Sequence, residues 1–357
     1  MNSYESIFKE MGESARAASI VLQQLPEVRI NEVLCAMADA LVQHSEQILK
    51  ANNMDMDSAR GVVPDTMLDR LLLSKNRIHQ MAEGVRQVSL LPSPVGTVLE
   101  NIDRPNGLHI EKRAVPFGVI GIIFEARPNV TVDAGALCFK TANATILRGG
   151  KEAFRTNRII VSLMQDVLEA HDLPRAAIQL VEVLDREAVS VLLQQRRYID
   201  VVIPRGGAGL IQRVVRDSMI PVIETGSGVC HTYVDAEANI DMAVDIAVNA
   251  KVQRPSVCNS METLLVHSSI AKEFLLALET KLAHHHVTIH GTPEVLQIVN
   301  GVAVDDNSFG TEYNDFDLNV AIVSSVDEAI SHINRYTTHH SEAIVTACLH
   351  EGRHAYQ

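Results

Sequence analysis

An alternation of apolar runs and helix-like segments between residues 119 and 223 is the feature that most constrains the fold of this chain. The run Val119-Ile-Gly-Ile-Ile-Phe124 is almost continuously apolar, as expected for a parallel strand buried on both faces. Further strand-like segments lie at 144–147, 178–181, 200–203 and 220–223, and helical patterns separate them at 130–142, 151–170, 186–194 and 208–217. Strands that alternate with helices of this length predict βαβ units and a doubly wound, Rossmann-type α/β sheet.

The residues that precede this alternation are predicted to form helices and a two-stranded ribbon. Apolar residues such as Ile30, Val33 and Met37 recur at helical spacing in the first part of the chain. Two strand-like segments, 95–103 and 108–115, flank a turn that contains an Asn-Gly step, which favours a chain reversal. We expect this ribbon to be a protruding arm that supports a homo-oligomer.

Two glycine-containing turns indicate a dinucleotide-binding site. Arg148-Gly-Gly-Lys151 and Pro204-Arg-Gly-Gly-Ala-Gly209 each follow a predicted strand and precede a predicted helix. Backbone N–H groups at such a position can bind a phosphate, and the carboxyl edge of an open α/β sheet is where ligands bind. No GxGxxG motif follows the first strand of the alternation, and ordinary helix-start turns with solvated basic residues are the alternative interpretation.

Composition narrows the class of partner. The net charge is −13, aromatic residues make up 4% of the chain and Trp is absent, which disfavours nucleic acid and anionic membrane as partners. Five cysteines without a CxxC pair predict a reduced, cytoplasmic protein, and no signal peptide or membrane span is predicted. Histidine runs at 284–286 and 339–340 are interpreted as exposed turns, and no metal site is expected.

Cys258 is the candidate nucleophile. It lies in the run Gln253-Arg-Pro-Ser-Val-Cys-Asn-Ser-Met-Glu-Thr263, after a proline and before a strand-like segment. A thiolate in such a position can form a covalent intermediate, whereas a buried structural cysteine is the alternative interpretation. Cys35 and Cys138 are predicted to be core residues, and Cys230 is predicted to be inert.

Several long runs resemble one known family. They are Val115-Pro-Phe-Gly-Val-Ile-Gly121, Glu125-Ala-Arg-Pro-Asn-Val-Thr-Val-Asp133, Ile146-Leu-Arg-Gly-Gly-Lys-Glu152, Ile203-Pro-Arg-Gly-Gly-Ala-Gly209 and Val248-Asn-Ala-Lys-Val-Gln-Arg-Pro-Ser-Val-Cys258. On these runs the chain resembles the aldehyde dehydrogenase superfamily, and within it the reductases that act on glutamyl phosphate, from about residue 10 to about residue 346. The resemblance implies a cofactor-binding domain at 1–96 and 116–254, an oligomerisation ribbon at 97–115 and a second α/β catalytic domain at 255–357.

The resemblance assigns the catalytic and substrate-binding residues. It implies that Cys258 is the nucleophile, that the backbone N–H of Asn259 stabilises the oxyanion, and that Asn129 is a second donor. Arg127 and Arg254 are candidates for the carboxylate or phosphate of the substrate, with a structural ion pair as the alternative for each. Glu224 matches the general base of hydrolytic relatives, but a phosphate leaving group removes the need to activate water for deacylation.

The resemblance also assigns the cofactor-binding residues. It places Arg148 and Lys151 near the adenosine ribose, Gly206 and Gly207 near the pyrophosphate, and Glu312 on the nicotinamide ribose. Lys151 stands where many NAD-using relatives have a glutamate, and a lysine favours a 2′-phosphate, so NADP is the expected cofactor.

The implied activity is the NADPH-dependent reduction of L-glutamyl 5-phosphate to glutamate 5-semialdehyde and phosphate in proline biosynthesis, through a thioester on Cys258. Functional coupling to glutamate 5-kinase is a further expectation. The final residues 347–357 do not match the expected continuation, so the catalytic domain is expected to be incomplete through a frameshift or early stop. The alternatives are a CoA-acylating aldehyde dehydrogenase and an inactive remnant that folds and binds a dinucleotide.

Overall fold

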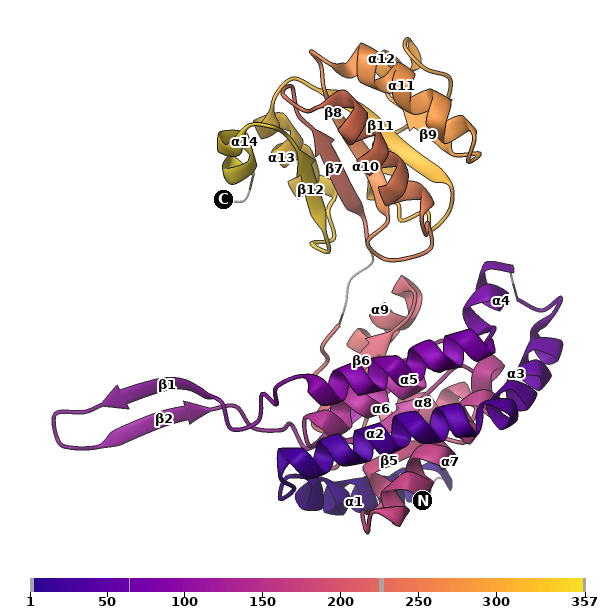
Figure 1. Ribbon diagram of the computed structural model, residues 1–357, viewed down its shortest axis with the longest axis vertical. Coiled ribbons are helices and arrows are strands. Elements are labelled where there is room, and N and C mark those ends of the chain that lie inside the picture. Colours follow the sequence, from indigo (N-terminus) through magenta and orange to yellow (C-terminus); the bar gives the residue numbers. More distant parts are fainter. Residues whose placement is uncertain (1–2, 64, 225–227, 356–357) are drawn as a thin grey trace. The chain divides into compact units, whose positions relative to one another are not determined.

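The computed structural model describes residues 3–63, 65–224 and 228–355, and its chain divides into two units, Met1–Glu224 and Thr225–Gln357 (Figure 1). The expected domain boundary after residue 254 falls inside the second unit. The reason is that β7 (Cys230–Val234) pairs with β8 (Met261–His267) in one sheet. The helix that connects these strands, α10 (Ile240–Val252), therefore belongs to the second unit.

Helices make up the first part of the N-terminal unit. They are α1 (Ser3–Leu22), α2 (Glu27–Gln43), α3 (Ser45–Ala59), α4 (Asp65–Leu71) and α5 (Lys75–Leu90). The ribbon follows as the antiparallel strands β1 (Val98–Asp103) and β2 (His109–Arg113), and it projects from the helices of this unit (Figure 1). Almost every residue of the ribbon is exposed.

A four-stranded parallel sheet lies at the centre of the N-terminal unit, in the order β5-β4-β3-β6. The elements follow the chain as β3 (Val119–Phe124), α6 (Pro128–Lys140), β4 (Ala144–Arg148), the 3-10 turn Lys151–Ala153, α7 (Phe154–Ala170), the 3-10 turn Arg175–Ala177, β5 (Ile178–Leu180), α8 (Arg186–Leu192), β6 (Val201–Arg205) and α9 (Ala208–Asp217). All six residues of β3 are buried, as its apolar run predicts. The doubly wound sheet is confirmed.

The start of α7 is fixed by a buried carboxylate from another helix. Asp55 on α3 is 1% exposed, and its Oδ2 accepts hydrogen bonds from the backbone N–H of Thr156 at 2.8 Å and from its hydroxyl at 2.7 Å. Negative charge at a helix N-terminus satisfies N–H groups that have no partner within the helix. The N-terminal helices therefore set the position of the helix that follows β4.

The second unit contains a six-stranded parallel sheet in the order β10-β9-β11-β8-β7-β12. Its further elements are α11 (Ala271–Ala283), β9 (Thr288–Gly291), α12 (Pro293–Leu296), β10 (Val302–Ala303), the 3-10 turn Ser308–Gly310, β11 (Asp317–Val323), α13 (Val326–Tyr336), β12 (Glu342–Val345) and α14 (Leu349–His354). α10 and α11 enclose one apolar core with this sheet, and Phe309 and α13 contribute to another. The predicted second α/β unit is confirmed as a fold.

Two local predictions differ from the structure. The segment 220–223 forms only an isolated bridge between Val202 and Val222, because Pro221 has no N–H to donate. Cys35 is exposed rather than buried, since the buried stripe of α2 runs through Val33, Leu34 and Met37 and Cys35 lies beside it.

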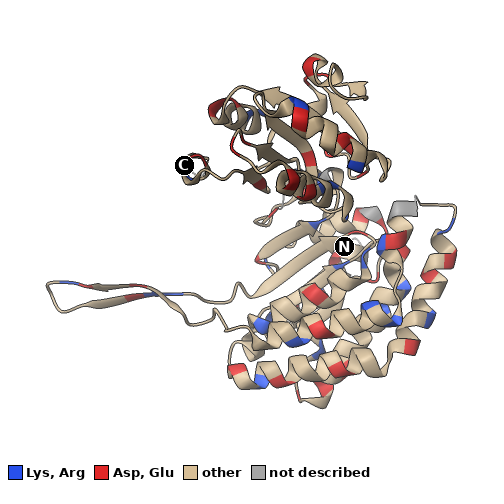
Figure 2. Ribbon diagram, turned by 45° about the horizontal axis from the view of Figure 1, so that its top comes forward, with Lys and Arg blue, Asp and Glu red and all other residues tan. Residues whose placement is uncertain are grey.

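Charged residues of both signs are interspersed over the helices (Figure 2). None of the helices in the described ranges has the length and apolar character needed to cross a bilayer.

Candidate active site

The turns after β3 and β6 meet at the carboxyl edge of the N-terminal sheet, where the strand order reverses. Glu125 follows β3, and its Oε1 accepts a hydrogen bond from the backbone N–H of Gly207 at 3.0 Å. Gly207 precedes α9, so a carboxylate already lies at the N-terminus of this helix. A Cβ on Gly206 would lie 2.7 Å from Cδ of Glu125, so the Glu125 side chain packs directly against this glycine. The position therefore suits a negatively charged group, and the phosphate of a dinucleotide is such a group.

The turn after β4 reaches the same edge. A Cβ on Gly150 would lie 3.1 Å from the backbone nitrogen of Ala126, so this turn packs against the end of β3. The guanidinium of Arg148 donates to the carbonyls of Gly149 at 2.7 Å and Leu184 at 3.1 Å, which ties the turn to the segment before α8. Lys151 is exposed. Arg148 thus shapes the turn, and the ammonium of Lys151 is available to a ligand.

The start of α6 carries two further predicted residues. Asn129 is exposed in the first turn of α6, and its side-chain amide donates to Oδ2 of Asp133 at 3.0 Å. Burial raises the pKa of Asp133. Arg127 is half-buried at the N-cap of α6 and has an interaction partner of its own. Because the amide of Asn129 has two N–H donors, one can serve an oxyanion while the other stays on Asp133.

Cys258 lies in the loop between α10 and β8, at the amino edge of the second sheet. It is half-buried, and turns that link Val257 to Arg254 and Ser260 to Val257 hold the loop, with N–O distances of 3.2 Å and 3.0 Å. Arg254 and Asn259, which flank this segment, are exposed. The structure therefore brings three predicted residues of the second unit together on one short loop.

The carbonyl of Cys258 contacts the segment that leads into β7. A Cβ on Gly228 would lie 1.6 Å from this carbonyl oxygen, so the two backbones are in direct contact. The thiol of Cys230 donates to the same oxygen at 3.3 Å. Burial, followed by the nearby Glu342, raises the pKa of Cys230 to about 12. Cys230 therefore stays protonated near neutral pH and acts as a donor.

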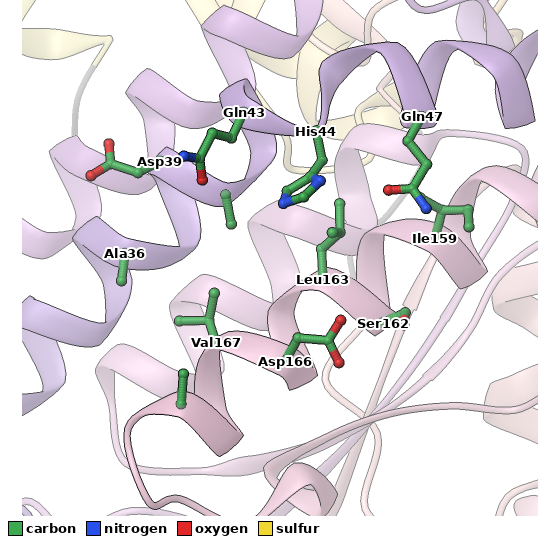
Figure 3. A pocket seen from close by; sticks show the side chains of 12 residues that line it. Ala36, Asp39, Gln43, His44, Gln47, Ile159, Ser162, Leu163, Asp166 and Val167 are labelled. Atoms are coloured by element: carbon green, nitrogen blue, oxygen red, sulfur yellow. The ribbon is translucent and has the colours of Figure 1, made fainter.

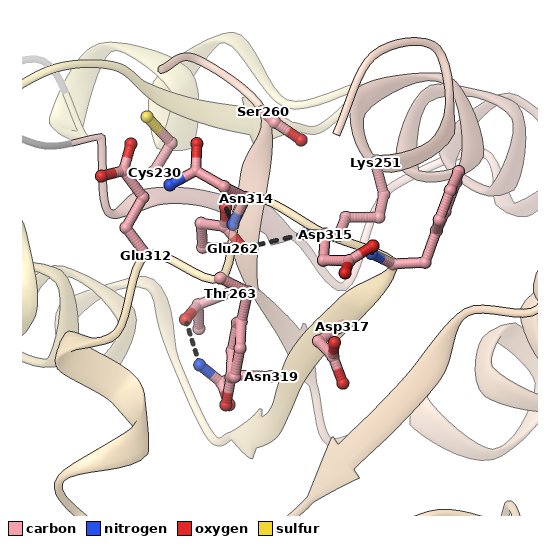
Figure 4. Close-up of polar contacts among 12 residues, drawn as sticks. Cys230, Lys251, Ser260, Glu262, Thr263, Glu312, Asn314, Asp315, Asp317 and Asn319 are labelled. Carbon is pink, nitrogen blue, oxygen red and sulfur yellow. Dashed lines mark hydrogen bonds and ion pairs between the residues drawn. The ribbon is translucent and has the colours of Figure 1, made fainter. Parts of the chain in front are cut away.

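Glu312 contacts the same segment, because its Oε1 accepts from the backbone N–H of Gly228 at 3.0 Å. Close to it, a buried ion pair joins Lys251 and Glu262 at 2.8 Å, and Oε1 of Glu262 accepts from the backbone N–H of Asn314 at 3.2 Å (Figure 4). The sequence analysis missed this pair. The available signal was a lysine and a glutamate that bracket the Cys258 loop, each next to an apolar residue.

A groove of about 590 Å³ in the N-terminal unit does not belong to this arrangement (Figure 3). It lies between α2, the start of α3 and α7, and its lining on α7 begins at Ile159. Gly149, in the turn after β4, contacts α7 at Asn157, so the groove lies farther along that helix. His44, Asp39 and Asp166 line it.

Comparisons with known proteins agree with the resemblance. Residues 3–297 match the aldehyde dehydrogenase family. The chain is 51% identical over 337 residues to a gamma-glutamyl phosphate reductase of Moorella thermoacetica, which covers 94% of this chain and 81% of that protein. A gamma-glutamyl phosphate reductase of Serratia marcescens is 48% identical over 354 residues, covering 98% of this chain and 85% of that protein.

Solved structures give the same result for the fold. The gamma-glutamyl phosphate reductase of Thermotoga maritima is 39% identical with a TM-score of 0.92, covering 97% of this chain and 84% of that one. A propionaldehyde dehydrogenase of Rhodopseudomonas palustris with bound CoA shares the fold alone, at 16% identity and a TM-score of 0.69. The chain therefore belongs to the aldehyde dehydrogenase family and, within it, to the gamma-glutamyl phosphate reductases.

Proposed function

We propose that the chain reduces L-glutamyl 5-phosphate to L-glutamate 5-semialdehyde and phosphate, in proline biosynthesis, through a thioester on Cys258. The observation that carries this proposal is the half-buried Cys258 on a loop whose backbone is held by Gly228 and Cys230, in a chain 51% identical to a gamma-glutamyl phosphate reductase. A fixed backbone with a half-exposed thiol is the arrangement that nucleophilic catalysis needs.

The chemistry assigned to Cys258 proceeds in two stages. Its thiolate attacks the acyl carbon, a C–S bond forms, the C–O bond to the phosphate breaks, and phosphate leaves. The chemistry that a nicotinamide dinucleotide would supply when bound is the hydride that reduces the thioester on Cys258. The resulting thiohemiacetal then collapses to the aldehyde and releases the Cys258 thiolate. The backbone N–H of Asn259, directly after the nucleophile, is assigned to the oxyanion, and removing one such donor typically costs ~3–4 kcal/mol.

We assign the cofactor to the carboxyl edge of the N-terminal sheet and infer that it is NADP. Gly206 and Gly207 precede α9, and the carboxylate of Glu125 at Gly207 occupies a position suited to a phosphate, so this carboxylate must give way on binding. The exposed ammonium of Lys151 would attract a 2′-phosphate, whereas a carboxylate would repel it. Arg148 supports the turn, and Glu312 is assigned to the nicotinamide ribose, whose hydroxyls would donate to Oε2 while Oε1 keeps its bond to the N–H of Gly228.

The substrate is assigned to the exposed Arg254 and Asn129 and the half-buried Arg127, and the assembly is assigned to the exposed ribbon. Arg254 is exposed near the nucleophile, and Arg127 lies at the N-cap of α6, so these two side chains are our candidates for binding the anionic groups of the substrate. Asn129, in the first turn of α6, is our candidate for the second oxyanion donor.

The projecting ribbon exposes Leu99 and Leu108, which supports a role in a homo-oligomer. Native mass spectrometry of the chain with and without residues 98–113 tests the ribbon.

The experiment that tests the function is the reverse reaction, in which NADP is reduced with glutamate semialdehyde in the presence or absence of phosphate. We expect phosphate-dependent turnover that Cys258→Ala abolishes and that Cys35→Ala, at an exposed cysteine of the other unit, leaves intact. Dependence on CoA instead of phosphate would identify an acylating dehydrogenase. NADPH binding without thiol-dependent turnover would identify a chain that folds but does not catalyse the reaction.

A further inference from the structure

A buried ion pair closes the base of the loop that carries Cys258 (Figure 4). Lys251 lies in the last turn of α10 and Glu262 is the second residue of β8, so the pair brackets the loop. The ammonium Nζ and the carboxylate Oε2 are 2.8 Å apart, and the two side chains are 0% and 1% exposed. Because desolvation offsets the attraction between buried charges, stability alone does not account for such a pair.

The second carboxylate oxygen of Glu262 extends the connection to another loop. It accepts from the backbone N–H of Asn314, and Glu312, two residues earlier, accepts from the N–H of Gly228. Gly228 in turn lies against the carbonyl of Cys258. The side chain of Glu262 is therefore linked to the nucleophile from two sides, through its own loop and through the loop of Glu312.

We propose that Lys251 and Glu262 are positioning residues that hold Cys258 and Glu312 in register with each other. Neither side chain is accessible to a substrate, so neither is a catalytic residue. The ammonium of Lys251 fixes the orientation of the Glu262 carboxylate, and the carboxylate fixes the backbone at Asn314. This inference rests on the proposed function, in which Cys258 is the nucleophile.

The test removes the pair without leaving a buried charge. In Lys251→Met/Glu262→Leu both charges are replaced by apolar groups of similar size, a change that buried ion pairs often tolerate in stability. The matched control is Asp245→Asn/Lys281→Met, which removes an exposed pair between α10 and α11. Glu262→Gln is measured beside them as the isosteric change, and thermal unfolding establishes that each variant is folded.

Two readouts separate positioning from a merely structural role. We expect kcat of the folded pair variants to fall by about 10²-fold, with little change in KM, because a misplacement of about 1 Å has that effect on a reacting group. We also expect the pH profile of Cys258 alkylation by iodoacetamide, followed at that residue by peptide mass spectrometry, to shift in these variants and not in the control.

The outcomes decide between the two roles. Unchanged kcat and an unchanged alkylation profile in a folded variant would overturn the inference. Failure of both Lys251→Met/Glu262→Leu and Glu262→Gln to fold would also overturn it, since the pair would then be needed for folding itself. If the wild-type chain shows no thiol-dependent turnover, the proposed function fails, but the alkylation profile of Cys258 still decides the positioning role.

Discussion

Gly228→Ala places a methyl group in the backbone contact that supports Cys258. The new Cβ would lie 1.6 Å from the carbonyl oxygen of Cys258 and 2.5 Å from its carbonyl carbon. Ordinary contact begins at 3.4 Å, so the two backbones would have to separate by 1.8 Å, the difference between 3.4 and 1.6. Both neighbours are main-chain atoms, which cannot rotate away as the end of a flexible side chain can.

We expect the substitution to impair both catalysis and stability. Overpacking of a buried site costs about 1–3 kcal/mol, whereas a displacement of about 1 Å at a reacting group costs about 10²-fold in rate. We therefore expect kcat of Gly228→Ala to fall by about 10²-fold or more, in a protein that still folds. The Gly228 N–H that donates to Glu312 would move with the backbone.

The assay is phosphate-dependent NADP reduction, with urea unfolding as the measure of stability. Gly310→Ala is the matched control in the same unit, because a Cβ at Gly310 meets no atom within 4 Å. A Gly228→Ala protein with the kcat of the wild type would refute the argument that this contact positions the nucleophile. An equal loss in Gly310→Ala would show that the assay reports general damage.

Three further outcomes are expected. Lys151→Glu should lower the preference for NADP over NAD by about tenfold or more, measured as the ratio of kcat/KM values, and an unchanged ratio would contradict the assigned role of this exposed ammonium. Burial raises the pKa of Glu262 to about 6, so the stability that this carboxyl contributes is complete below its ordinary pKa and is lost as the pH rises through 6. The free energy of unfolding of the wild type, relative to that of Glu262→Gln, should therefore fall by about 2 kcal/mol between pH 4 and pH 7 in urea unfolding. A difference that does not change with pH would contradict a raised pKa at Glu262. Asp55→Ala should lower the free energy of unfolding by about 2–3 kcal/mol, because it leaves the N–H of Thr156 buried without its partner, and a loss below about 0.5 kcal/mol would exclude the capping role.

The strands and the ribbon could be predicted from sequence because their signals are local. The apolar run at 119–124 forms the fully buried β3, and the Asn-Gly step lies between β1 and β2 as expected. The segment 220–223 shows the limit of local signals, because strand pairing also requires backbone N–H groups that can donate to the neighbouring strand. Cys35 shows a second limit: without knowledge of the helices that pack against α2, the edge of its buried stripe is uncertain by one residue.

The candidate site was predictable only in part. The position of Cys258 on a loop before a strand follows from local sequence, whereas the contacts of its carbonyl come from Gly228 and Cys230, which precede it by about thirty positions. The buried pair of Lys251 and Glu262 could not be predicted without the tertiary structure, because both residues are of types that are seldom fully buried. The motif that contains Glu125 predicts no partner for its carboxylate, because the bond to the N–H of Gly207 requires β3 and β6 to be neighbours.

Cys230 and Cys258 show how burial assigns different chemistry to the same side chain. Burial is the main reason that the pKa of Cys230 is raised to about 12, so near neutral pH its thiol keeps the proton that it donates to the carbonyl of Cys258. Only the thiolate is an effective nucleophile, so Cys230 is unreactive although it lies beside the candidate site. Cys258 is half-buried and retains access to solvent. The thiol of Cys230 thus supports the backbone, whereas the thiol of Cys258 is accessible for reaction. This difference arises because Cys230 lies in strand β7 and Cys258 lies on the loop before β8.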